Sequence, residues 1–553
     1  MATVNDPRST PASMNEANDR DPFNNNSYGT LVDRPYNEVS LPILDVHDFN
    51  NRIIHDYEAG LGEKELPAEL SLARSLVPAG TATLRDFSYV SPEIPEFIAE
   101  NCTGCMDCVT ECPDTAILGK VIAEPDLEAK LTQMIDDPED RAMFAEQWAT
   151  PRKYYDGPKK KGLEGGRFAI IIDPSKCKGC AECVTVCDDL ALKMIPKSEP
   201  VIDKIRKSHR YFKDVGPSDD RYINDNLLID MMLKEETHIY VGGAGSCAGC
   251  GEGTALRMLC AATGAKYGDQ WAIVAATGCN TVYTSTYPYN PYLVPWTNSL
   301  FENAPADAMG VRMRWNQMGW TDKPIWCIGG DGAMFDIGFQ SLSRLFASGM
   351  NVKVFVLDTQ VYSNTGGQAS TSTFTGQNTK MSIHGKKFDG KQERRKEIAQ
   401  IAMMHPNTFV AQTTCAHTNH FYKAVLGAME FDGPAIVNCY TTCQPEHGVG
   451  DHMASNQARL AVDSRAFPLL IYNPSKAERI KERLSLQGNP AMKEDWWKNP
   501  KSGETVDFID FARSEGRFSK HFDRDGQPSE TLLRSKQDRL ENWHLLQELA
   551  GLR

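Results

Sequence analysis

Two segments of the sequence carry four cysteines each at the same spacing. The first, NCTGCMDCVTECPDTAI (101–117), separates its cysteines by two, two and three residues, and a proline follows the last one. The second, DPSKCKGCAECVTVCDDLALKM, begins at Asp173 and repeats this spacing. A CxxCxxC loop can hold three corners of a four-iron cluster, while the fourth thiolate comes from elsewhere. Paired CxxC motifs can also bind zinc, but a complete run that occurs twice favours iron–sulfur clusters.

Together the two cysteine runs resemble bacterial two-cluster ferredoxins over about 90 residues, a family in which the fourth cysteine of each run serves the other cluster. On this pattern one cluster is held by Cys102, Cys105, Cys108 and Cys187, and the other by Cys177, Cys180, Cys183 and Cys112. The 64 residues between Cys112 and Cys177 are many for that family and predict an inserted segment. Asp188 stands where the first run has Pro113, a change expected to affect the turn more than ligation.

Two later segments each predict a strand that ends in a loop with polar side chains. In IWCIGGDGAMFDIGFQSL (325–342), a strand leads into a glycine loop with Asp331 and then a helix. Glycine before a helix N-terminus favours a phosphate group, and a carboxylate offers Mg²⁺ a hard oxygen. The segment VKVFVLDTQVYSNTGGQ (352–368) places Thr359 28 residues and Asn364 33 residues after Asp331. The pair of loops predicts a magnesium and diphosphate site.

The elements that must position these loops follow an α/β pattern over about 237–445, where short apolar strands end in glycine or cysteine loops and helices follow. Strands are predicted in HIYVGGAGSCAGC, WAIVAATGC, IWCIGGDG, VKVFVLDT and AIVNCYTTC. Ligands gather at the carboxyl ends of the strands in an open parallel sheet. The predicted fold class is therefore an α/β domain with a mostly parallel sheet, together with a small α+β ferredoxin-like domain that holds two clusters.

These motifs also resemble a known enzyme family. The GDG…N arrangement looks like the thiamine-diphosphate magnesium motif. The segments GSCAGCGEG, ATGC, PWTNSLFEN and LDTQVYSNTGGQ closely resemble pyruvate:ferredoxin (flavodoxin) oxidoreductases. The resemblance covers roughly residues 96 to 475, including FPLLIYNP, and the motifs occur in the family's order.

The resemblance implies a role for individual residues. The magnesium ligands would be Asp331, Thr359 and the Val361 carbonyl, and Asn364 would contact the diphosphate and the bound 2-oxoacid as the catalytic residue. The family usually has an aromatic residue in place of Ala333, a change expected to alter packing rather than metal binding. The cofactor-binding residues implied are Glu252, Cys279, Gly330, Asp331, Gly332, Ala333, Thr359, Gln360, Val361, Tyr362, Ser363 and Asn364.

A third four-iron cluster is also implied by the resemblance, with the ligands Cys247, Cys250, Cys279 and Cys443. Each of these cysteines is predicted to follow an apolar strand, as Asp331 and Thr359 do, so cofactor and cluster would share one sheet edge. Cys439 lies near Cys443 and is an alternative fourth ligand. Core packing is the expectation for the remaining cysteines, Cys260, Cys327, Cys415 and Cys439.

The function implied by the resemblance is thiamine-dependent, coenzyme A-acylating decarboxylation of pyruvate to acetyl-CoA and CO₂. Electrons would pass one at a time through three 4Fe–4S clusters to ferredoxin or flavodoxin. The domain that supplies the family's pyrimidine-binding glutamate and substrate-binding arginine is not recognisable in the 553 residues. A second subunit with the pyrimidine-binding and coenzyme A-related domains is therefore expected, in a heterotetramer with two copies of each chain.

Three alternatives remain open on the sequence. The chain could act on another 2-oxoacid, or it could be an electron-transfer subunit with a vestigial thiamine site, although Asp331, Thr359 and Asn364 are intact. A thiamine decarboxylase without redox chemistry would leave twelve ordered cysteines unexplained.

Composition excludes several classes of protein. The net charge of −14 argues against nucleic acid as a partner, because no basic excess is available to neutralise phosphates. No apolar run approaches the length of a membrane span. The first 30 residues lack the apolar core of a signal peptide and are too acidic for a transit peptide, so a cytoplasmic location is expected. The 16 cysteines are clustered, which indicates metal ligation rather than a disulfide framework.

The predicted organisation has five parts. An N-terminal arm and extension (1–95) precedes the cysteine-run domain (96–200), and a linker (201–236) leads to the thiamine-diphosphate domain (237–460). A polar C-terminal extension (461–553) follows and is expected to pack on a partner subunit.

Overall fold

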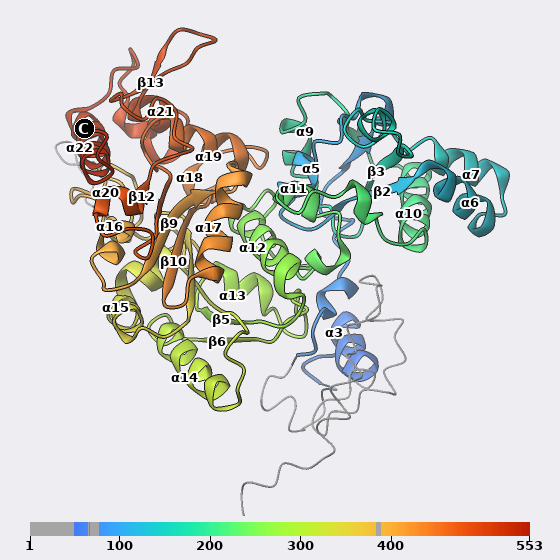
Figure 1. Ribbon diagram of the computed structural model, residues 1–553, viewed down its shortest axis with the longest axis horizontal. Helices are drawn as coiled ribbons and strands as arrows, with labels where there is room; N and C mark the ends of the chain where they lie inside the picture. Colours follow the sequence, from blue (N-terminus) through green and yellow to red (C-terminus); the bar gives the residue numbers. More distant parts are fainter. Residues whose placement is uncertain (1–48, 65, 67–76, 383–388) are drawn as a thin grey trace, which may run out of the picture. The chain divides into compact units, whose positions relative to one another are not determined.

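The computed structural model describes residues 49–64, 66, 77–382 and 389–553. The chain divides into two compact units, residues 1–78 and 79–553 (Figure 1). In the first unit, a π-helical segment, η2 (Phe49–Ile54), continues into α3 (His55–Glu58). The arm predicted over about residues 1–40 lies outside the described residues. The end of the predicted N-terminal extension, from residue 79, belongs to the second unit.

Within the described residues, eight strands form the main sheet of the second unit in the order β12-β11-β9-β10-β8-β7-β5-β6. The six strands from β9 to β6 are parallel, and β11 and β12 are antiparallel to their neighbours. The prediction of an α/β domain with a mostly parallel sheet is confirmed. The strands are β5 (Ala272–Ala276), β6 (Trp296–Ser299), β7 (Ile325–Gly330), β8 (Lys353–Asp358), β9 (Phe409–Thr414), β10 (Ala435–Tyr440), β11 (Leu470–Tyr472) and β12 (Leu484–Ser485).

Helices cover both faces of the central strands. Successive side chains of a strand point to opposite faces of the sheet, so neighbouring residues of one strand contact different helices. Val354 and Val356 of β8 pack into one apolar cluster with residues of α14, α15 and α16. Phe355, between them, contacts Phe421 of α17, and Trp326 of β7 donates to Thr263 of α12. The helices on these faces are α12 (Gly251–Tyr267), α14 (Ala304–Gln317), α15 (Phe339–Ser348), α16 (Ile398–Met403) and α17 (Thr418–Glu430).

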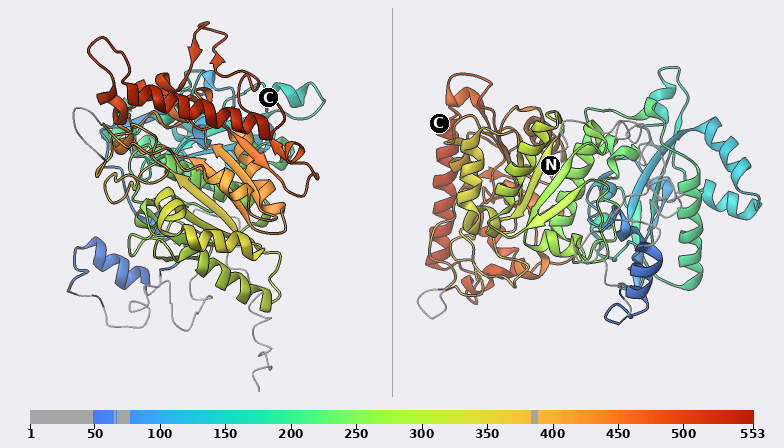
Figure 2. Two further views of the ribbon diagram at one scale, coloured as in Figure 1. Left: turned by 90° about the vertical axis from the view of Figure 1, so that its left-hand side faces the viewer. Right: turned by 90° about the horizontal axis from the view of Figure 1, so that it is seen from below.

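The predicted C-terminal extension (461–553) differs from expectation, because it continues the same domain. It contributes β11 and β12 to the main sheet, and Trp543 and Leu546 of the last helix are buried in the apolar cluster on β8. That helix, α22 (Glu530–Leu549), is the long red helix in Figure 2. The other elements of this part are α20 (Ile480–Arg483), β13 (Trp497–Lys498), β14 (Thr505–Val506) and α21 (Phe508–Arg513). The helix α18 (Gln444–His447) precedes the extension, and α19 (Ala454–Asp463) runs into its start.

The cysteine runs lie in a small α+β region. Two antiparallel pairs, β1 (Glu93–Phe97) with β4 (Leu192–Pro196) and β2 (Ile117–Ala123) with β3 (Gly166–Ile172), flank them. Each run passes through a short helix, α5 (Asp107–Thr110) or α9 (Glu182–Thr185). The predicted inserted segment forms α6 (Glu124–Met134), α7 (Pro138–Ala145) and α8 (Asp156–Lys159).

The predicted linker (201–236) is also structured. Most of its first half belongs to α10 (Glu199–Asp214), whose Phe212 is buried with Ile122 of β2 and Ile171 of β3. The short helix α11 (Leu228–Met231) follows. No helix in the described parts of the chain is both long and apolar enough to cross a membrane.

A buried ion pair fixes the carboxyl end of β8. Arg395 contacts Asp358, the last residue of the strand, and both side chains are almost fully buried. Loss of one partner from a buried pair leaves an uncompensated charge and costs about 3–5 kcal/mol. We therefore expect Arg395→Gln to lower the free energy of unfolding by this amount and to lower the thermal midpoint in calorimetry. Arg206 is 53% exposed in a pair with Asp203, which is 67% exposed, so Arg206→Gln should cost less than about 1 kcal/mol. Equal midpoints for the two variants would contradict this account.

Candidate functional site

The predicted magnesium ligands lie at the carboxyl ends of two adjacent strands. Asp331 directly follows β7 and Thr359 directly follows β8, and the two strands pair in parallel. Parallel strands present their carboxyl ends at one edge, so the two side chains come together. Both are buried, as is Val361.

The oxygen atoms of these residues form a close group. The Thr359 Oγ1 lies 3.2 Å from Asp331 Oδ1, 3.1 Å from the Val361 carbonyl oxygen and 2.6 Å from Ser363 Oγ. Adjacent ligands of an octahedral Mg²⁺ with bonds of about 2.1 Å are about 3.0 Å apart. The donor set and its spacing therefore fit a magnesium ion. A hydroxyl has one hydrogen, so Thr359 can satisfy only one of these acceptors by itself.

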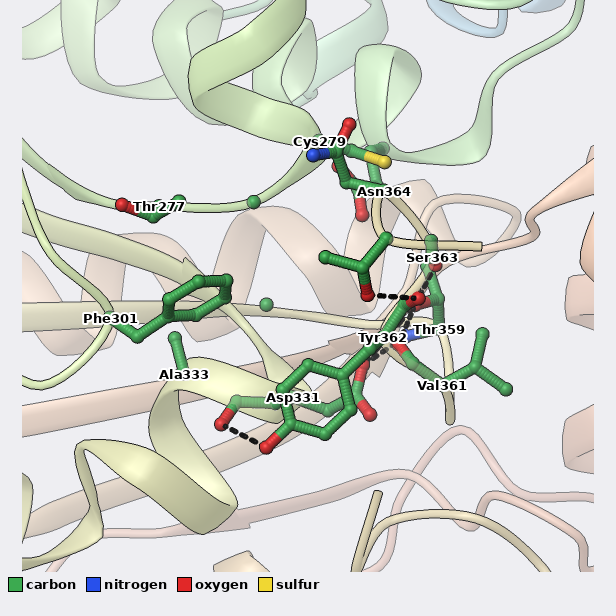
Figure 3. A pocket seen from close by; sticks show the side chains of 15 residues that line it. Thr277, Cys279, Phe301, Asp331, Ala333, Thr359, Val361, Tyr362, Ser363 and Asn364 are labelled. Carbon is green, nitrogen blue, oxygen red and sulfur yellow. Dashed lines mark hydrogen bonds between the residues drawn. The ribbon is translucent and has the colours of Figure 1, made fainter. Parts of the chain in front are cut away.

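A pocket of about 320 Å³ opens beside this oxygen group (Figure 3). Gly332 provides a cradle there, since a Cβ on it would lie 2.3 Å from the Tyr362 ring. Ala333, at the position of the family's usual aromatic residue, also lines the pocket. The lining residues are Glu252, Thr277, Gly278, Cys279, Phe301, Gly330, Asp331, Gly332, Ala333, Thr359, Val361, Tyr362, Ser363, Asn364 and Thr365.

Gln360 alone among the predicted cofactor-binding residues is absent from this lining, within the described residues. Its backbone has φ of 58°, and its side-chain amide bonds the carboxylate of Asp358 and the guanidinium of Arg517. The left-handed backbone turns this side chain into the domain. The side chain of Gln360 thus supports the loop from beneath, and its contact with the cofactor stays a prediction.

Burial and the nearby Asp358 raise the pKa of Asp331 well above its usual range. Ser370 Oγ donates to the Oδ2 of Asp331, a contact that the sequence analysis missed. Ser370 lies 39 residues after Asp331, and no spacing rule could identify it. A divalent cation at the oxygen group would supply the missing positive charge and favour the ionised carboxylate.

Glu252 faces the same pocket from the first turn of α12. Burial raises its pKa to about 8, and its nearest polar partner is the Tyr283 hydroxyl at 3.4 Å. It also lines a second hollow of about 510 Å³. The two hollows share five lining residues: Glu252, Cys279, Thr359, Ser363 and Asn364.

The second hollow is lined by the third predicted group of cysteines, Cys247, Cys250, Cys279 and Cys443. Cys439, the alternative to Cys443, lies in β10 with its side chain fully buried next to Cys415. Only two of these four cysteines, Cys279 and Cys443, follow a strand of the sheet, because the predicted strand HIYV forms an isolated bridge between Tyr240 and Tyr292.

The two cysteine runs line two further hollows of about 330 Å³ each. Each hollow combines three cysteines of one run with the fourth cysteine of the other. The first is lined by Cys102, Cys105, Cys108 and Cys187, and the second by Cys112, Cys177, Cys180 and Cys183.

The backbone of the two runs has the same unusual conformation. Gly104 and Gly179 have φ of 74° and 68°, and Met106 and Ala181 have φ of 71° and 64°. The backbone N–H groups of Gly104 and Gly179 act against burial, which raises the pKa of Cys102 and of Cys177. Successive N–H groups in such turns form concave sites for anions, including iron–sulfur clusters.

The chemistry of the three cysteine groups fits clusters ligated by thiolates. Burial raises the pKa of Cys102 and of Cys177 to about 12, so binding of a cluster would release the thiol protons. Zinc would require four sulfurs that converge on one ion. No group of three or more His, Cys, Asp or Glu side chains in the described ranges is arranged to hold a single metal ion.

Comparison with known proteins agrees with this geometry. Residues 276–439 match the model of the C-terminal TPP-binding domain of thiamine pyrophosphate enzymes. A probable pyruvate-flavodoxin oxidoreductase of Escherichia coli K12 is 28% identical over 516 residues, which cover 80% of this chain and 41% of that protein. The pyruvate:ferredoxin oxidoreductase of Moorella thermoacetica is 27% identical over 563 residues, or 87% of this chain and 44% of that protein.

A shorter relative decides the family. Pyruvate synthase subunit PorB of Pyrococcus furiosus is 35% identical over 295 residues, which cover 51% of this chain and 86% of that protein. The chain belongs to the pyruvate:ferredoxin (flavodoxin) oxidoreductase family. It spans about two fifths of the length of the first two relatives. Strands β6, β7, β8 and β9 and every pocket-lining residue except Glu252 lie within the residues that match the TPP-binding domain.

The oxygen group gives a test of the magnesium site. We expect Asp331→Asn to weaken binding of thiamine diphosphate in the presence of Mg²⁺ by at least about 100-fold, because the only carboxylate in the group loses its charge. Calorimetric titration measures the affinity. The control is Asp336→Asn, since Asp336 bonds Thr371 and Tyr362 but lies outside the oxygen group. Unchanged affinity in Asp331→Asn would rule out this carboxylate as a ligand.

The third cysteine group allows a matched pair of variants. Cys443→Ser should remove one cluster, or about four irons per chain, because Cys443 lines the hollow. Cys439→Ser should retain the full iron content, because this side chain is buried in β10. Iron analysis and electron paramagnetic resonance of anaerobically purified protein make the measurement. Loss of iron in Cys439→Ser alone would reverse the assignment.

Proposed function

We propose that this chain is the thiamine- and cluster-bearing subunit of a pyruvate:ferredoxin oxidoreductase. The reaction converts pyruvate and coenzyme A to acetyl-CoA and CO₂, and two electrons pass singly to ferredoxin or flavodoxin. The observation that carries this proposal is the continuity between the two hollows, which share Glu252, Cys279, Thr359, Ser363 and Asn364. A cofactor pocket and a cysteine group that share residues allow direct transfer of electrons.

The chain's own residues would hold the cofactor by its diphosphate. Asp331, the Thr359 hydroxyl and the Val361 carbonyl would bind Mg²⁺, and Gly332 leaves room for the phosphates against Tyr362. When bound, thiamine diphosphate supplies a centre that stabilises a carbanion during decarboxylation. Phe301 and Ala333 add apolar surface that excludes water from this end of the pocket.

Asn364 is suited to the catalytic role proposed for it. Its side chain lies at the end of the pocket near Cys279, away from Asp331 (Figure 3). The amide would donate to a phosphate or to a substrate oxygen, and the carbonyl oxygen would remain an acceptor. Because the Asn364 amide is neutral, it would orient the substrate without adding charge to the pocket.

Electrons would leave through the cysteine group shared with the pocket and then through the two groups of the cysteine runs. Lys178 of the second run donates to the carbonyl oxygens of Ala244 and Ser246, at 2.9 and 2.8 Å. Ser246 precedes Cys247, so this contact supports a path from the third cysteine group to the second run.

The pocket itself offers no cation for a substrate carboxylate. None of its fifteen lining residues carries a positive charge. A dicarboxylic substrate such as 2-oxoglutarate would need two cationic partners, whereas pyruvate needs one. A partner subunit would supply that cation, together with the glutamate that activates the cofactor's pyrimidine ring.

The proposed assembly is a heterotetramer of two copies of this chain and two of a subunit with the pyrimidine-binding and coenzyme A-related domains. Support comes from the share of the longer relatives that the chain spans and from the separate subunit among the matches. Clusters held by thiolates need a reducing compartment, so we place the assembly in the cytoplasm.

The test is anaerobic reduction of a viologen dye by the complex purified with its natural partner chain. Thiamine diphosphate, Mg²⁺ and coenzyme A are present, and pyruvate is compared with 2-oxoglutarate and branched 2-oxoacids. We expect reduction that depends on coenzyme A with pyruvate only. Asp331→Asn should abolish it while dithionite still reduces the clusters.

Other outcomes would change the assignment. Reduction with a different 2-oxoacid would keep the mechanism and change the substrate. An absence of reduction with every acid, in protein with intact clusters, would favour an electron-transfer subunit with a vestigial thiamine site.

A further inference from the structure

Arg257 of α12 carries a buried charge beside the first cysteine run. Its side chain is 3% exposed. One terminal nitrogen donates to the carbonyl oxygens of Val109 and of Cys112, the latter at 2.9 Å, and the other donates to that of Ile117 at 2.9 Å. The guanidinium thus lies against the segment that contains the fourth cysteine of the run.

All the hydrogen bonds of the Arg257 guanidinium go to backbone carbonyl oxygens, and no carboxylate among the described residues lies within ion-pair distance of it. Lys178, which contacts the same segment, does have a carboxylate partner. Its ammonium lies 2.6 Å from the carboxylate of Asp114, so the two opposite charges compensate each other. Burial lowers the pKa of Arg257, and negative charge on Cys112, on Cys108 and then on Asp114 acts in the opposite direction.

A buried charge without a counter-charge is costly. A 4Fe–4S cluster with four thiolate ligands carries net negative charge, which increases when the cluster accepts an electron. A nearby buried cation therefore stabilises the reduced cluster more than the oxidised one, and it does so without screening by water. Net charge and surroundings are among the factors that set cluster potentials.

We propose that Arg257 is the counter-charge of the cluster held by Cys112, Cys177, Cys180 and Cys183, and that it raises the reduction potential of this cluster. The proposal rests on the iron–sulfur function proposed above. In the step concerned, Cys247, Cys250, Cys279 and Cys443 would hold the cluster that gives up one electron, and the cluster at Cys112 would accept it. Arg257 remains charged throughout, so no proton is transferred.

Helix α12 fixes the position of this cation relative to both clusters. Cys250 immediately precedes the helix, and Arg257 lies seven residues later, or about 10 Å along the axis. Thr254, between them, donates to the carbonyl oxygen of Glu111, next to Cys112. The same rigid element therefore holds one ligand of the donor cluster and the charge that favours the acceptor cluster.

The test is a redox titration of the full-length chain, purified anaerobically, with cluster potentials measured by electron paramagnetic resonance. Arg257→Gln keeps hydrogen-bond donors and removes the charge. We expect it to shift one cluster to lower potential by about 59 mV, which corresponds to a tenfold lower ratio of reduced to oxidised cluster. Arg257→Lys keeps the charge and should restore most of the potential.

A matched control separates charge from packing. Arg465 is another buried arginine that donates to backbone carbonyls, those of Pro490 and Ala491, but it contacts neither cysteine run. Arg465→Gln should leave all cluster potentials unchanged. Asp114→Asn removes a negative charge beside the same cluster, so the expected shift has the opposite sign.

The outcomes for the variants test the role of Arg257, and the outcome for the unmodified chain tests the iron–sulfur function. Unchanged potentials in Arg257→Gln with every cluster present would overturn the proposal, as would equal shifts in Arg257→Gln and Arg257→Lys. If the Arg257→Gln variant lacks the cluster, the cluster potential of Asp114→Asn is the test instead. An unchanged or lowered cluster potential in Asp114→Asn would overturn the proposal. An absence of clusters in the unmodified chain would instead overturn the iron–sulfur function.

Discussion

The close packing of the first turn of α12 is the constraint on which the site depends. Gly251 lies against Thr442, where a Cβ would come within 2.5 Å of the backbone nitrogen, and Gly253 lies against Pro113, where a Cβ would come within 3.1 Å. These contacts bring α12 next to the segments that contain Cys443 and Cys112. Glu252, between the two glycines, faces the cofactor pocket. Gly251, Glu252 and Gly253 therefore bring the cysteine runs, the third cysteine group and the pocket next to one another.

A series of buried ion pairs beneath the pocket supports the loop that carries Thr359. Asp358 at the end of β8 pairs with Arg395, which also lies near Glu397, and Glu397 pairs with Arg539 of α22. The chain of charges connects the loop that begins at Thr359 to the C-terminal helix. Such pairs contribute little net stability, because burial of the charges offsets their attraction, but each is costly to break. The C-terminal segment thus supports the geometry of the oxygen group although it lies outside the pocket.

The sequence predicted the parts of this structure that depend on short-range pattern. Strands β5, β7, β8 and β10 were recognisable because an apolar run ends directly in a glycine, aspartate or cysteine loop. The short strand β6, in the motif PWTNSLFEN, and β11 and β12 carry no such signal, and their pairing is decided by tertiary contacts. Ser370 and Arg257 were missed for the same reason, since their partners are distant in sequence. The inward direction of the Gln360 side chain was not foreseeable, because it follows from a left-handed backbone that the neighbouring residues do not signal.

Exposed apolar side chains next to the hollows bear on the proposed partner. Val282, which lines the hollow of the third cysteine group, is 50% exposed, and Leu300, next to the pocket residue Phe301, is 59% exposed. Ile337, in the segment that follows Asp331, is 50% exposed. Water contact at these apolar side chains is unfavourable, and a covering subunit would remove it. The proposed second subunit would cover them and would bring the cation that the pocket lacks. Exclusion of water and recognition of the substrate carboxylate would then arise from a single interface.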